Sequence, residues 1–194
     1  MFSEEEISQQ ALDTIELQAQ SIAGLKNYVD AAFTGAVKLV HASKGRVVVT
    51  GIGKSAVIAQ KLVATFNSTG TPALFMHAAD AIHGDLGMIL PDDVVIIISK
   101  SGSSPEIKVL IPFIRNFGNQ VIAICGNQQS YLATNVDYFI NTTVEKEACP
   151  NNLAPTTSTT AQMVMGDALA VCLLSMKGFT AEDFARFHPG GALG

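Results

Sequence analysis

The sequence Ser99-Lys100-Ser101-Gly102-Ser103-Ser104-Pro105-Glu106 lies between an apolar run, Val94 to Ile98, and a second apolar segment that starts at Ile107. The run is typical of a buried strand and the second segment has helical periodicity, so this stretch is predicted to connect a strand to a helix. N–H groups at a helix start, the helix dipole and serine hydroxyls all favour an anion. We therefore expect phosphate binding here, and an ordinary helix cap in a serine-rich turn is the alternative.

Strand and helix patterns alternate over the rest of the chain. Strands are expected at 46–51, 72–76, 94–99, 120–125 and 136–142, and helices at 54–67, 105–117 and 159–176. Several of the strands are apolar without alternation, as expected when helices cover both faces of a parallel sheet. The pattern predicts one structural domain of the α/β class, a three-layer αβα sandwich with a five-stranded parallel sheet.

Two helices are expected ahead of the sheet. Ser3 and Glu6 form a capping-box pattern that opens a helix over 3–24, and a second helix is expected over 28–41. Helices placed in this way usually cover the sheet or pack against another subunit. We expect residues 1–44 to pack on the core that residues 45–194 form.

Composition limits the class of protein. Of the 194 residues, 48% are apolar and 15% are charged, which indicates a globular chain that hides surface in an oligomer. The net charge of −5 argues against nucleic acid as a partner. The cysteines have no metal or disulfide spacing, the N-terminus does not resemble a signal peptide, and no apolar run reaches the roughly 18 residues of a membrane span. We expect a cytoplasmic protein without a membrane partner.

Polar residues follow the predicted strands at their carboxyl ends, where parallel sheets bind ligands. The first strand is followed by Gly51-Ile52-Gly53-Lys54-Ser55, the second by His77 and His83, the third by the serine-rich turn, and the fifth by Glu147 and the segment 154–160. This concentration predicts an active site at one edge of the sheet.

The segment Gly51 to Ala56 is not a nucleotide P-loop, because Val48 stands where that motif needs glycine. A dinucleotide fingerprint is disfavoured as well, because no acidic residue ends the second strand. A glycine turn that presents Lys54 to a small anion fits better, and a solvated lysine is the alternative.

Titratable residues at the same edge suggest proton transfer. Glu106 and Glu147 are candidate acid/base groups, with solvated glutamates as the alternative. His77 and His83 are interpreted either as a metal pair or as hydrogen-bonding loop histidines. His188, in Phe187-His188-Pro189-Gly190, can accept or donate a proton, or can simply mark the end of a helix.

Taken together, these segments resemble the sugar isomerase (SIS) domain and, within it, arabinose-5-phosphate isomerases, which feed the synthesis of 3-deoxy-D-manno-octulosonate (Kdo) for lipopolysaccharide or capsule. The resemblance covers about residues 45–194 in order. Its most specific segments are Lys146-Glu147-Ala148-Cys149-Pro150, Leu153-Ala154-Pro155 and the ending 187–194. Long family members continue into two CBS modules, and this sequence ends at Gly194, so the resemblance implies a short form or a piece of a longer protein.

The resemblance implies conversion of D-ribulose 5-phosphate to D-arabinose 5-phosphate through a cis-enediol, with no required cofactor. Glu147 is assigned as the base, His188 as the acid and Lys54 as the charge stabiliser, and Glu106 would orient or share proton transfer. The roles of the two glutamates could be exchanged. Zinc at His77 would be inhibitory. The substrate-binding residues are expected to be Gly53, Ser55, Gly70, Thr71, His77, His83, Ser99, Ser101, Ser103, Ser104, Thr156, Ser158 and Thr159.

The family pattern departs at two positions, because Lys100 and Ser103 replace the asparagine and glutamate that are usual in relatives. The resemblance also implies a homotetramer, in which His83 or His188 reaches a neighbouring subunit's site. Kdo or its CMP-activated form is hypothesised to act as a feedback ligand at Lys54, Lys100 and the serine turn. Another SIS isomerase, for a hexulose or heptose phosphate, and a non-catalytic phosphosugar regulator are the alternative functions.

Overall fold

Five parallel strands form the centre of the computed structural model, which describes residues 2–190. Their order in the sheet is β2-β1-β3-β4-β5. The strands are β1 (Val47–Gly51), β2 (Ala73–His77), β3 (Val94–Ser99), β4 (Gln120–Cys125) and β5 (Tyr138–Asn141). The predicted five-stranded parallel sheet is therefore confirmed.

The strand order reverses at β1, because the chain places β2 on one side of β1 and β3 on the other. Gly51 at the end of β1 pairs in register with Ile98 near the end of β3. The loops that follow these two strands therefore start side by side. In an open parallel sheet, this switch point at the carboxyl edge is where ligands bind.

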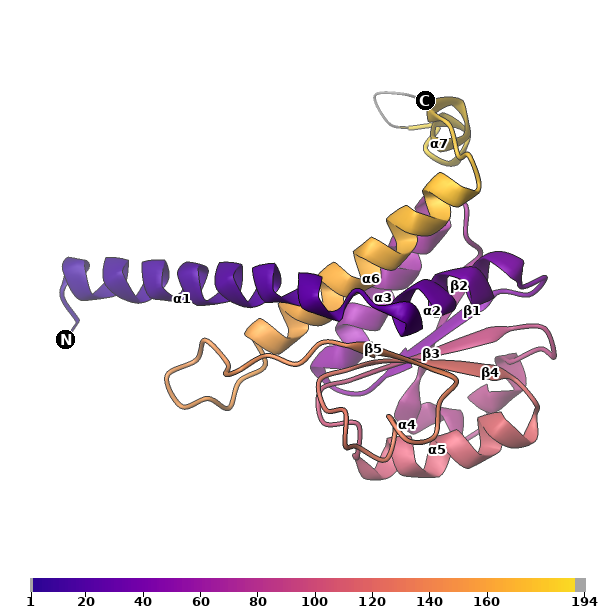
Figure 1. The fold of residues 1–194 in the computed structure, drawn as a ribbon, viewed down its shortest axis with the longest axis horizontal. Coiled ribbons are helices and arrows are strands. Elements are labelled where there is room, and N and C mark those ends of the chain that lie inside the picture. The colour runs from indigo at the N-terminus through magenta and orange to yellow at the C-terminus, as the bar shows by residue number, and fades with distance from the viewer. Residues whose placement is uncertain (1, 191–194) are drawn as a thin grey trace.

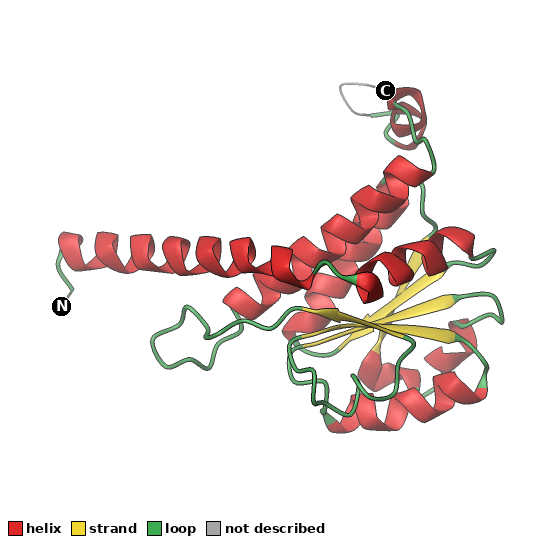
Figure 2. Ribbon diagram, in the orientation of Figure 1, coloured by secondary structure: helices red, strands yellow, loops and turns green. Residues whose placement is uncertain are grey.

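Helices cover both faces of the sheet (Figures 1 and 2). One face packs against α2 (Ala31–Ala42), α3 (Lys54–Ser68) and α6 (Thr157–Met176). The other packs against α4 (Ala78–Ala81) and α5 (Pro105–Asn116). This is the three-layer αβα arrangement that the sequence predicts.

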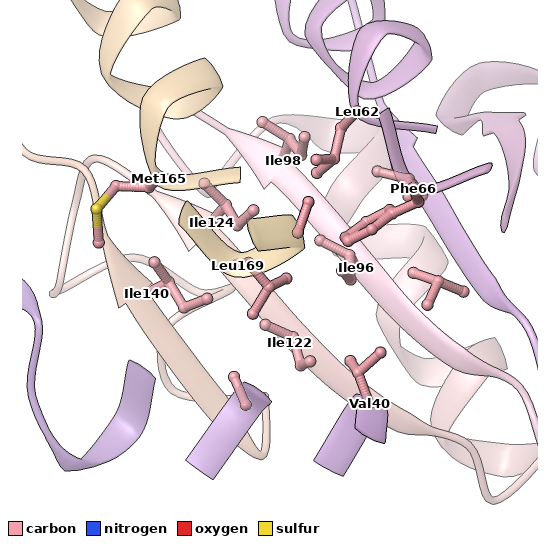
Figure 3. Packing of buried hydrophobic residues seen from close by; sticks show 14 of the residues in the cluster. Val40, Leu62, Phe66, Ile96, Ile98, Ile122, Ile124, Ile140, Met165 and Leu169 are labelled. Carbon is pink, nitrogen blue, oxygen red and sulfur yellow. The ribbon is translucent and has the colours of Figure 1, made fainter. Parts of the chain in front are cut away.

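Alternate residues of the central strands fill two separate cores. Ile96 and Ile98 of β3 pack with Leu62 and Phe66 of α3, as Figure 3 shows, whereas Ile97 points to the opposite face. Every residue of β3 is buried, which explains why this strand lacks apolar–polar alternation. The two cores hold the strand ends, and hence the loops of the site, in fixed positions.

The helix α6 is long and apolar enough to cross a membrane by length and composition, although Gln162 and Asp167 interrupt its apolar residues. Its buried residues pack instead on α3 and on the sheet. At Gly166 the two helices approach so closely that an added Cβ would lie 3.0 Å from Leu62. We therefore interpret α6 as a core helix.

The N-terminal helix α1 (Glu4–Gly24) starts with the predicted capping box, in which Glu6 N donates to Ser3 Oγ and Ser3 N donates to Glu6 Oε2. The helix extends away from the body (Figure 1) and none of its residues is buried. Thr160 of α6 donates a hydrogen bond to its Gln18. The expectation that residues 1–44 pack on the core thus describes α2, whose Phe33 and Val37 are buried, but not the exposed part of α1.

Several boundaries differ from the sequence prediction. The last strand is shorter than expected, and α6 begins at Thr157, before the predicted start at 159. The short helices α4 and α7 (Ala181–Phe187) were not predicted, nor were the 3₁₀ helices η1 (Leu25–Tyr28) and η2 (Asp85–Met88). The start of α7 has a capping box of Thr180 and Asp183, a signal that the sequence does contain.

Candidate active site

The loop after β1 presents Lys54 at the switch point of the sheet. Gly53 precedes α3 with φ of +57°, a left-handed conformation that favours glycine, and it caps the helix without a side chain. Lys54 is the first residue of α3 and is exposed. Ser55 points inward instead, where its hydroxyl donates to Oε1 of Gln162 at 3.1 Å. Lys54 is thus available to a ligand, whereas Ser55 ties α3 to α6.

The serine-rich turn after β3 is held by its own hydroxyl groups. The backbone N–H of Gly102 donates to Ser99 Oγ at 2.9 Å, and the N–H of Tyr131 donates to Ser103 Oγ at 3.2 Å. Ser104 is the N-cap of α5, and Ser101 is exposed. A hydroxyl that accepts a hydrogen bond can still donate its own proton to an anion. The predicted phosphate-binding serines therefore also fix the shape of the turn.

Gly102 has a structural role that sequence reasoning did not assign. Its φ is +63°, and an added Cβ would lie 2.2 Å from Ser130 Oγ. Any side chain at this position would clash as well as strain the backbone. The turn therefore requires glycine for its close approach to the segment that follows β4.

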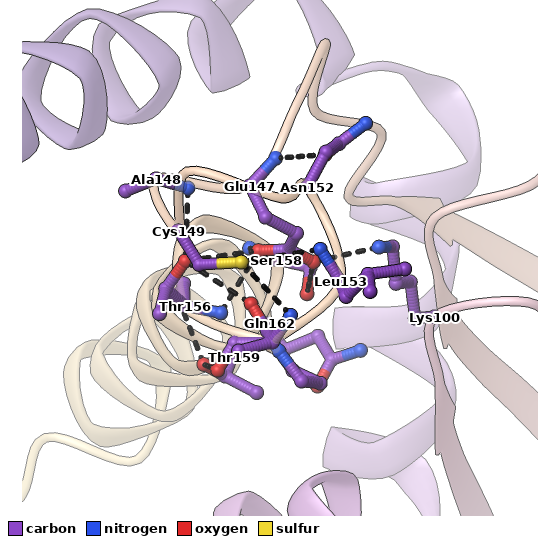
Figure 4. Close-up of polar contacts among 12 residues, drawn as sticks. Lys100, Glu147, Ala148, Cys149, Asn152, Leu153, Thr156, Ser158, Thr159 and Gln162 are labelled. Atoms are coloured by element: carbon purple, nitrogen blue, oxygen red, sulfur yellow. Dashed lines mark hydrogen bonds and ion pairs between the residues drawn. The ribbon is translucent and has the colours of Figure 1, made fainter.

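Glu147 lies buried at the start of α6, with 2% of its surface exposed (Figure 4). Its Oε2 accepts the N–H groups of Thr156 at 2.8 Å and Ser158 at 3.1 Å, and its Oε1 accepts the Ser158 hydroxyl. Thr156 makes no side-chain cap of its own. The Glu147 carboxylate therefore supplies the cap of α6, where the helix dipole favours a negative charge.

Lys100 comes from the serine turn and pairs with the same carboxylate. Its Nζ lies 2.7 Å from Oε1 of Glu147. Burial by itself would raise the pKa of Glu147, but the hydrogen bonds from Lys100, Ser158 and Thr156 outweigh it and lower the pKa to about 2. Glu147 is consequently ionised at neutral pH, and it joins the serine turn to the start of α6.

Two residues near Glu147 were missed by sequence reasoning. Asn152 accepts the backbone N–H of Glu147 at 2.7 Å and has a φ of 54°. Cys149 accepts N–H groups of Leu153 and Ala154 through its sulfur, and these bonds lower the pKa of the thiol. Asparagine tolerates left-handed backbone better than most residues, and this tolerance is the only signal in the sequence for the turn at Asn152.

Thr159 was predicted to bind substrate. Its hydroxyl group donates a hydrogen bond to the carbonyl oxygen of Thr156 within the first turn of α6.

Glu106 and His83 line a cavity of about 300 Å³ beside the serine turn, together with Ala78 and Ile82. Glu106 stands in the first turn of α5 and is partly exposed. His83 is exposed at the edge of this cavity. The pair is therefore accessible to a ligand, in contrast to Glu147.

His77 ends β2, and its Nδ1 lies 3.6 Å from Oδ2 of Asp80. Within residues 2–190, no three histidine, cysteine, aspartate or glutamate side chains gather closely enough to hold a metal ion. The described residues of one chain thus do not fit a complete zinc site at His77.

The structure does not bring Gly70, Thr71 and His188 to this edge of the sheet. Gly70 and Thr71 precede β2 and so lie at its amino end, where Lys177 Nζ donates to Gly70 O at 2.9 Å and to Thr71 Oγ1 at 2.8 Å. His188 follows α7, with its Nδ1 2.8 Å from Phe184 O. The 20 residues of α6 span about 30 Å and separate this end from Glu147. The remainder of the motif, 191–194, lies outside the described residues.

The fold and this cluster define an α/β domain with a polar, anion-favouring site at the carboxyl edge of its sheet. The sequence profile of the SIS domain matches residues 40–172. The chain therefore belongs to the SIS domain family, as the motifs indicated.

Two curated relatives are similar over most of the chain. The arabinose 5-phosphate isomerase KdsD of Escherichia coli K12 is 50% identical over 189 residues, which are 97% of this chain and 58% of that relative. KdsD of Pseudomonas aeruginosa is 51% identical over 181 residues, which are 93% of this chain and 56% of that relative. The chain thus spans just over half the length of the curated relatives that it matches.

Solved structures match over their full length. A protein of E. coli CFT073, solved in complex with arabinose 5-phosphate, superposes with a TM-score of 0.93 at 37% identity, and the match covers 97% of this chain and 100% of that one. A protein of Listeria monocytogenes superposes with a TM-score of 0.94 at 34% identity, and the match covers 98% and 100%.

Proposed function

We propose that this chain interconverts D-arabinose 5-phosphate and D-ribulose 5-phosphate through a cis-enediol. The main support is that the Lys100 ion pair joins the serine turn to Glu147, and that Lys54 follows β1, the strand next to the one that precedes this turn. The identity with KdsD over nearly the whole chain and the structural neighbour bound to arabinose 5-phosphate support this substrate class. The D-arabinose 5-phosphate formed in this reaction would enter Kdo synthesis in the cytoplasm.

The proposed reaction moves one proton between two carbons. A carboxylate removes the proton from C2 of the open-chain aldose while O1 gains a proton, which gives the cis-enediol. The protonated carboxyl group then returns its proton to C1 as O2 loses its hydroxyl proton and the C2 carbonyl forms. Lys54 stabilises the charge that develops on the carbonyl oxygen, and the serine turn holds the phosphate. His188 assists ring opening or protonates oxygen. The reduction of C1 and the oxidation of C2 balance within the sugar, so the proposal requires no redox cofactor.

Two carboxylates, those of Glu147 and Glu106, are candidates for the base that removes the C2 proton, and they differ in the hydrogen bonds that they accept. Glu147 acts as the base in our proposal, although its carboxylate accepts several hydrogen bonds in the described structure. Glu106 is the alternative, since it lines an open cavity with His83. The activities of Glu106→Gln and Glu147→Gln, measured separately, distinguish which of the two glutamates is the base.

We also propose a homotetramer in which a neighbouring subunit completes the site. The supporting observation is that Gly70, Thr71 and His188 lie at the opposite end of α6 from Glu147. In addition, α1 exposes Ile7, Leu12 and Ile15 to more than half of their surface, and an apolar groove of about 410 Å³ lies between α2 and α6. Burial of such surface favours association.

The test is turnover of purified protein with D-arabinose 5-phosphate in D₂O, followed by proton NMR. Exchange through an enediol incorporates deuterium at C1 of the ketose, which a hydride shift would not do. Parallel reactions with hexulose and heptose phosphates separate the alternative isomerases from the proposed one. Binding of all these phosphosugars without turnover of any would instead favour a non-catalytic regulator.

A further inference from the structure

In the described structure, the Glu147 carboxylate has no lone pair left for a substrate proton. Oε2 accepts from Thr156 N, Thr156 Oγ1 and Ser158 N, and Oε1 accepts from Ser158 Oγ and Lys100 Nζ. An ionised carboxylate offers about four lone-pair sites, and these five donors already exceed that number. A general base must be within reach of the proton that it removes. One donor therefore has to leave before Glu147 can act.

The donors differ in how firmly the fold holds them. Thr156 and Ser158 belong to the start of α6, and Ser158 is buried. Lys100 belongs to a different loop, and its side chain is 47% exposed. A lysine ammonium sits on a flexible four-carbon stem, so it can move without disturbing the backbone. Lys100 is the donor that can leave while α6 keeps its cap.

A competing anion for Lys100 is expected beside it. Lys100 follows Ser99 in the turn that the proposed function assigns to the substrate phosphate. A phosphate dianion carries more negative charge than a carboxylate, so it can compete with Glu147 for the ammonium group of Lys100. Among the groups on the Glu147 carboxylate, Lys100 supplies the ion pair, and Thr156 and Ser158 are neutral.

We propose that Lys100 couples the serine turn to Glu147: it pairs with Oε1 while the turn is empty and transfers to the phosphate when substrate binds. This inference rests on the proposed function, since it assumes the phosphate position assigned there. The transfer opens one lone pair on Oε1, which then accepts the proton from C2. Loss of the cation beside a buried carboxylate also raises its pKa, which makes Glu147 a stronger base. Lys100 thus acts as a positioning residue that makes the base available only when phosphate is bound.

The direct test is carbon NMR of protein labelled at the glutamate carboxyl, with the Glu147 signal assigned by its absence in Glu147→Gln. The pH midpoint of this signal is measured with and without inorganic phosphate, in the wild type and in Lys100→Met. The matched control is Lys108→Met, which removes an exposed lysine of α5 from the same segment.

In the wild type and in Lys108→Met, we expect phosphate to move the Glu147 midpoint upward by about one pH unit or more. In Lys100→Met, the midpoint is already raised, and phosphate has no further effect. An unchanged midpoint in the wild type, or an equal phosphate effect in Lys100→Met, overturns the inference.

A kinetic test uses D-arabinose, which lacks the phosphate, with phosphite added separately. Phosphite is expected to accelerate its isomerisation by the wild type and by Lys108→Met but not by Lys100→Met. Equal acceleration in all three proteins contradicts the coupling. Turnover of D-arabinose 5-phosphate by the wild type is measured in parallel. If that turnover is present and the phosphate effects are absent, the inference fails alone; if it is absent, the proposed function fails, and the NMR result still decides whether Lys100 links the anion to Glu147.

Discussion

The ammonium group of Lys100 lies 2.7 Å from Oε1 of Glu147. A residue of the turn between β3 and α5 thus forms an ion pair with a carboxylate of the loop between β5 and α6. This ion pair joins the two segments that the proposed reaction needs together, the phosphate-binding turn and the base. It also joins two structural tasks, because the same carboxylate caps α6.

The first prediction concerns the groups assigned to the chemistry. Lys54→Ala, Glu147→Gln and His188→Ala are each expected to lower kcat/KM for D-arabinose 5-phosphate by about 10² or more, the scale of a lost acid–base or electrostatic group. The measurement is a coupled ketose assay.

The exposed neighbours Lys108→Ala and Glu145→Gln serve as controls and should retain wild-type rates. Near-full activity of all three site variants would refute the mechanism. Loss of activity in Glu106→Gln with full retention in Glu147→Gln would exchange the roles of the two glutamates.

The second prediction concerns stability at acid pH. Because the folded state lowers the pKa of Glu147 to about 2, its ionised form stabilises the fold above the unfolded pKa, and this contribution is lost as pH falls from about 4.5 towards 2. A shift of this size corresponds to roughly 3 kcal/mol. Urea unfolding of the wild type should therefore weaken more between pH 6 and pH 3 than unfolding of Glu147→Gln does.

Asp93 is a second source of acid sensitivity, since the pKa of this carboxyl is lowered by hydrogen bonds from Arg46 and Leu90 in spite of its burial. Both proteins in the comparison retain it, so the difference between them isolates Glu147. Parallel pH profiles for the two proteins would show that folding does not lower the pKa of Glu147.

The third prediction concerns the subunit that completes the site. Glu147→Gln and His188→Ala should each have the low activity of the first prediction when tested alone, and the two changes lie at opposite ends of α6. When the two proteins are unfolded together and refolded as a mixture, some sites combine an intact Glu147 with an intact His188. We expect activity to return to a fraction of the wild-type rate.

A mixture of Glu147→Gln with Lys54→Ala is the matched control. Both residues belong to the same edge of the sheet of one chain, so every site in this mixture keeps one defect, and no activity should return. Absence of recovered activity in the first mixture, with both proteins folded, would contradict a shared site.

The fourth prediction concerns the exposed face of α1. Leu12→Glu together with Ile15→Glu places charges on apolar surface that a tetramer is expected to bury, so light scattering should report smaller species than the wild type. Asp13→Ala, on the same helix, is the control. A wild-type protein that is monomeric and fully active would contradict the proposed assembly.

The sequence predicted the sheet well because its strands are apolar on both faces, and burial of each residue of β3 is the physical cause of that pattern. It also predicted that Lys54, Glu106 and Glu147 belong to one edge, since residues after parallel strands meet there. It did not predict the Lys100–Glu147 pair, because a contact between two distant loops depends on side-chain reach. The position of Thr71 was open to inference, since a residue that precedes a parallel strand lies at the amino end.

The last prediction concerns feedback by the end product. Kdo carries a carboxylate and CMP-Kdo a phosphodiester, and either anion is expected to compete for Lys54, Lys100 and the N–H groups at the serine turn. CMP-Kdo should inhibit competitively against D-arabinose 5-phosphate, and Lys100→Asn should weaken the inhibition by removing one cation from the pocket. CMP alone distinguishes the sugar from the nucleotide, and Lys108→Asn controls for loss of charge elsewhere. No inhibition at millimolar concentration, or equal inhibition by CMP, would contradict a sugar-directed feedback site, because the proposed recognition depends on the sugar acid reaching the same turn that holds the substrate phosphate.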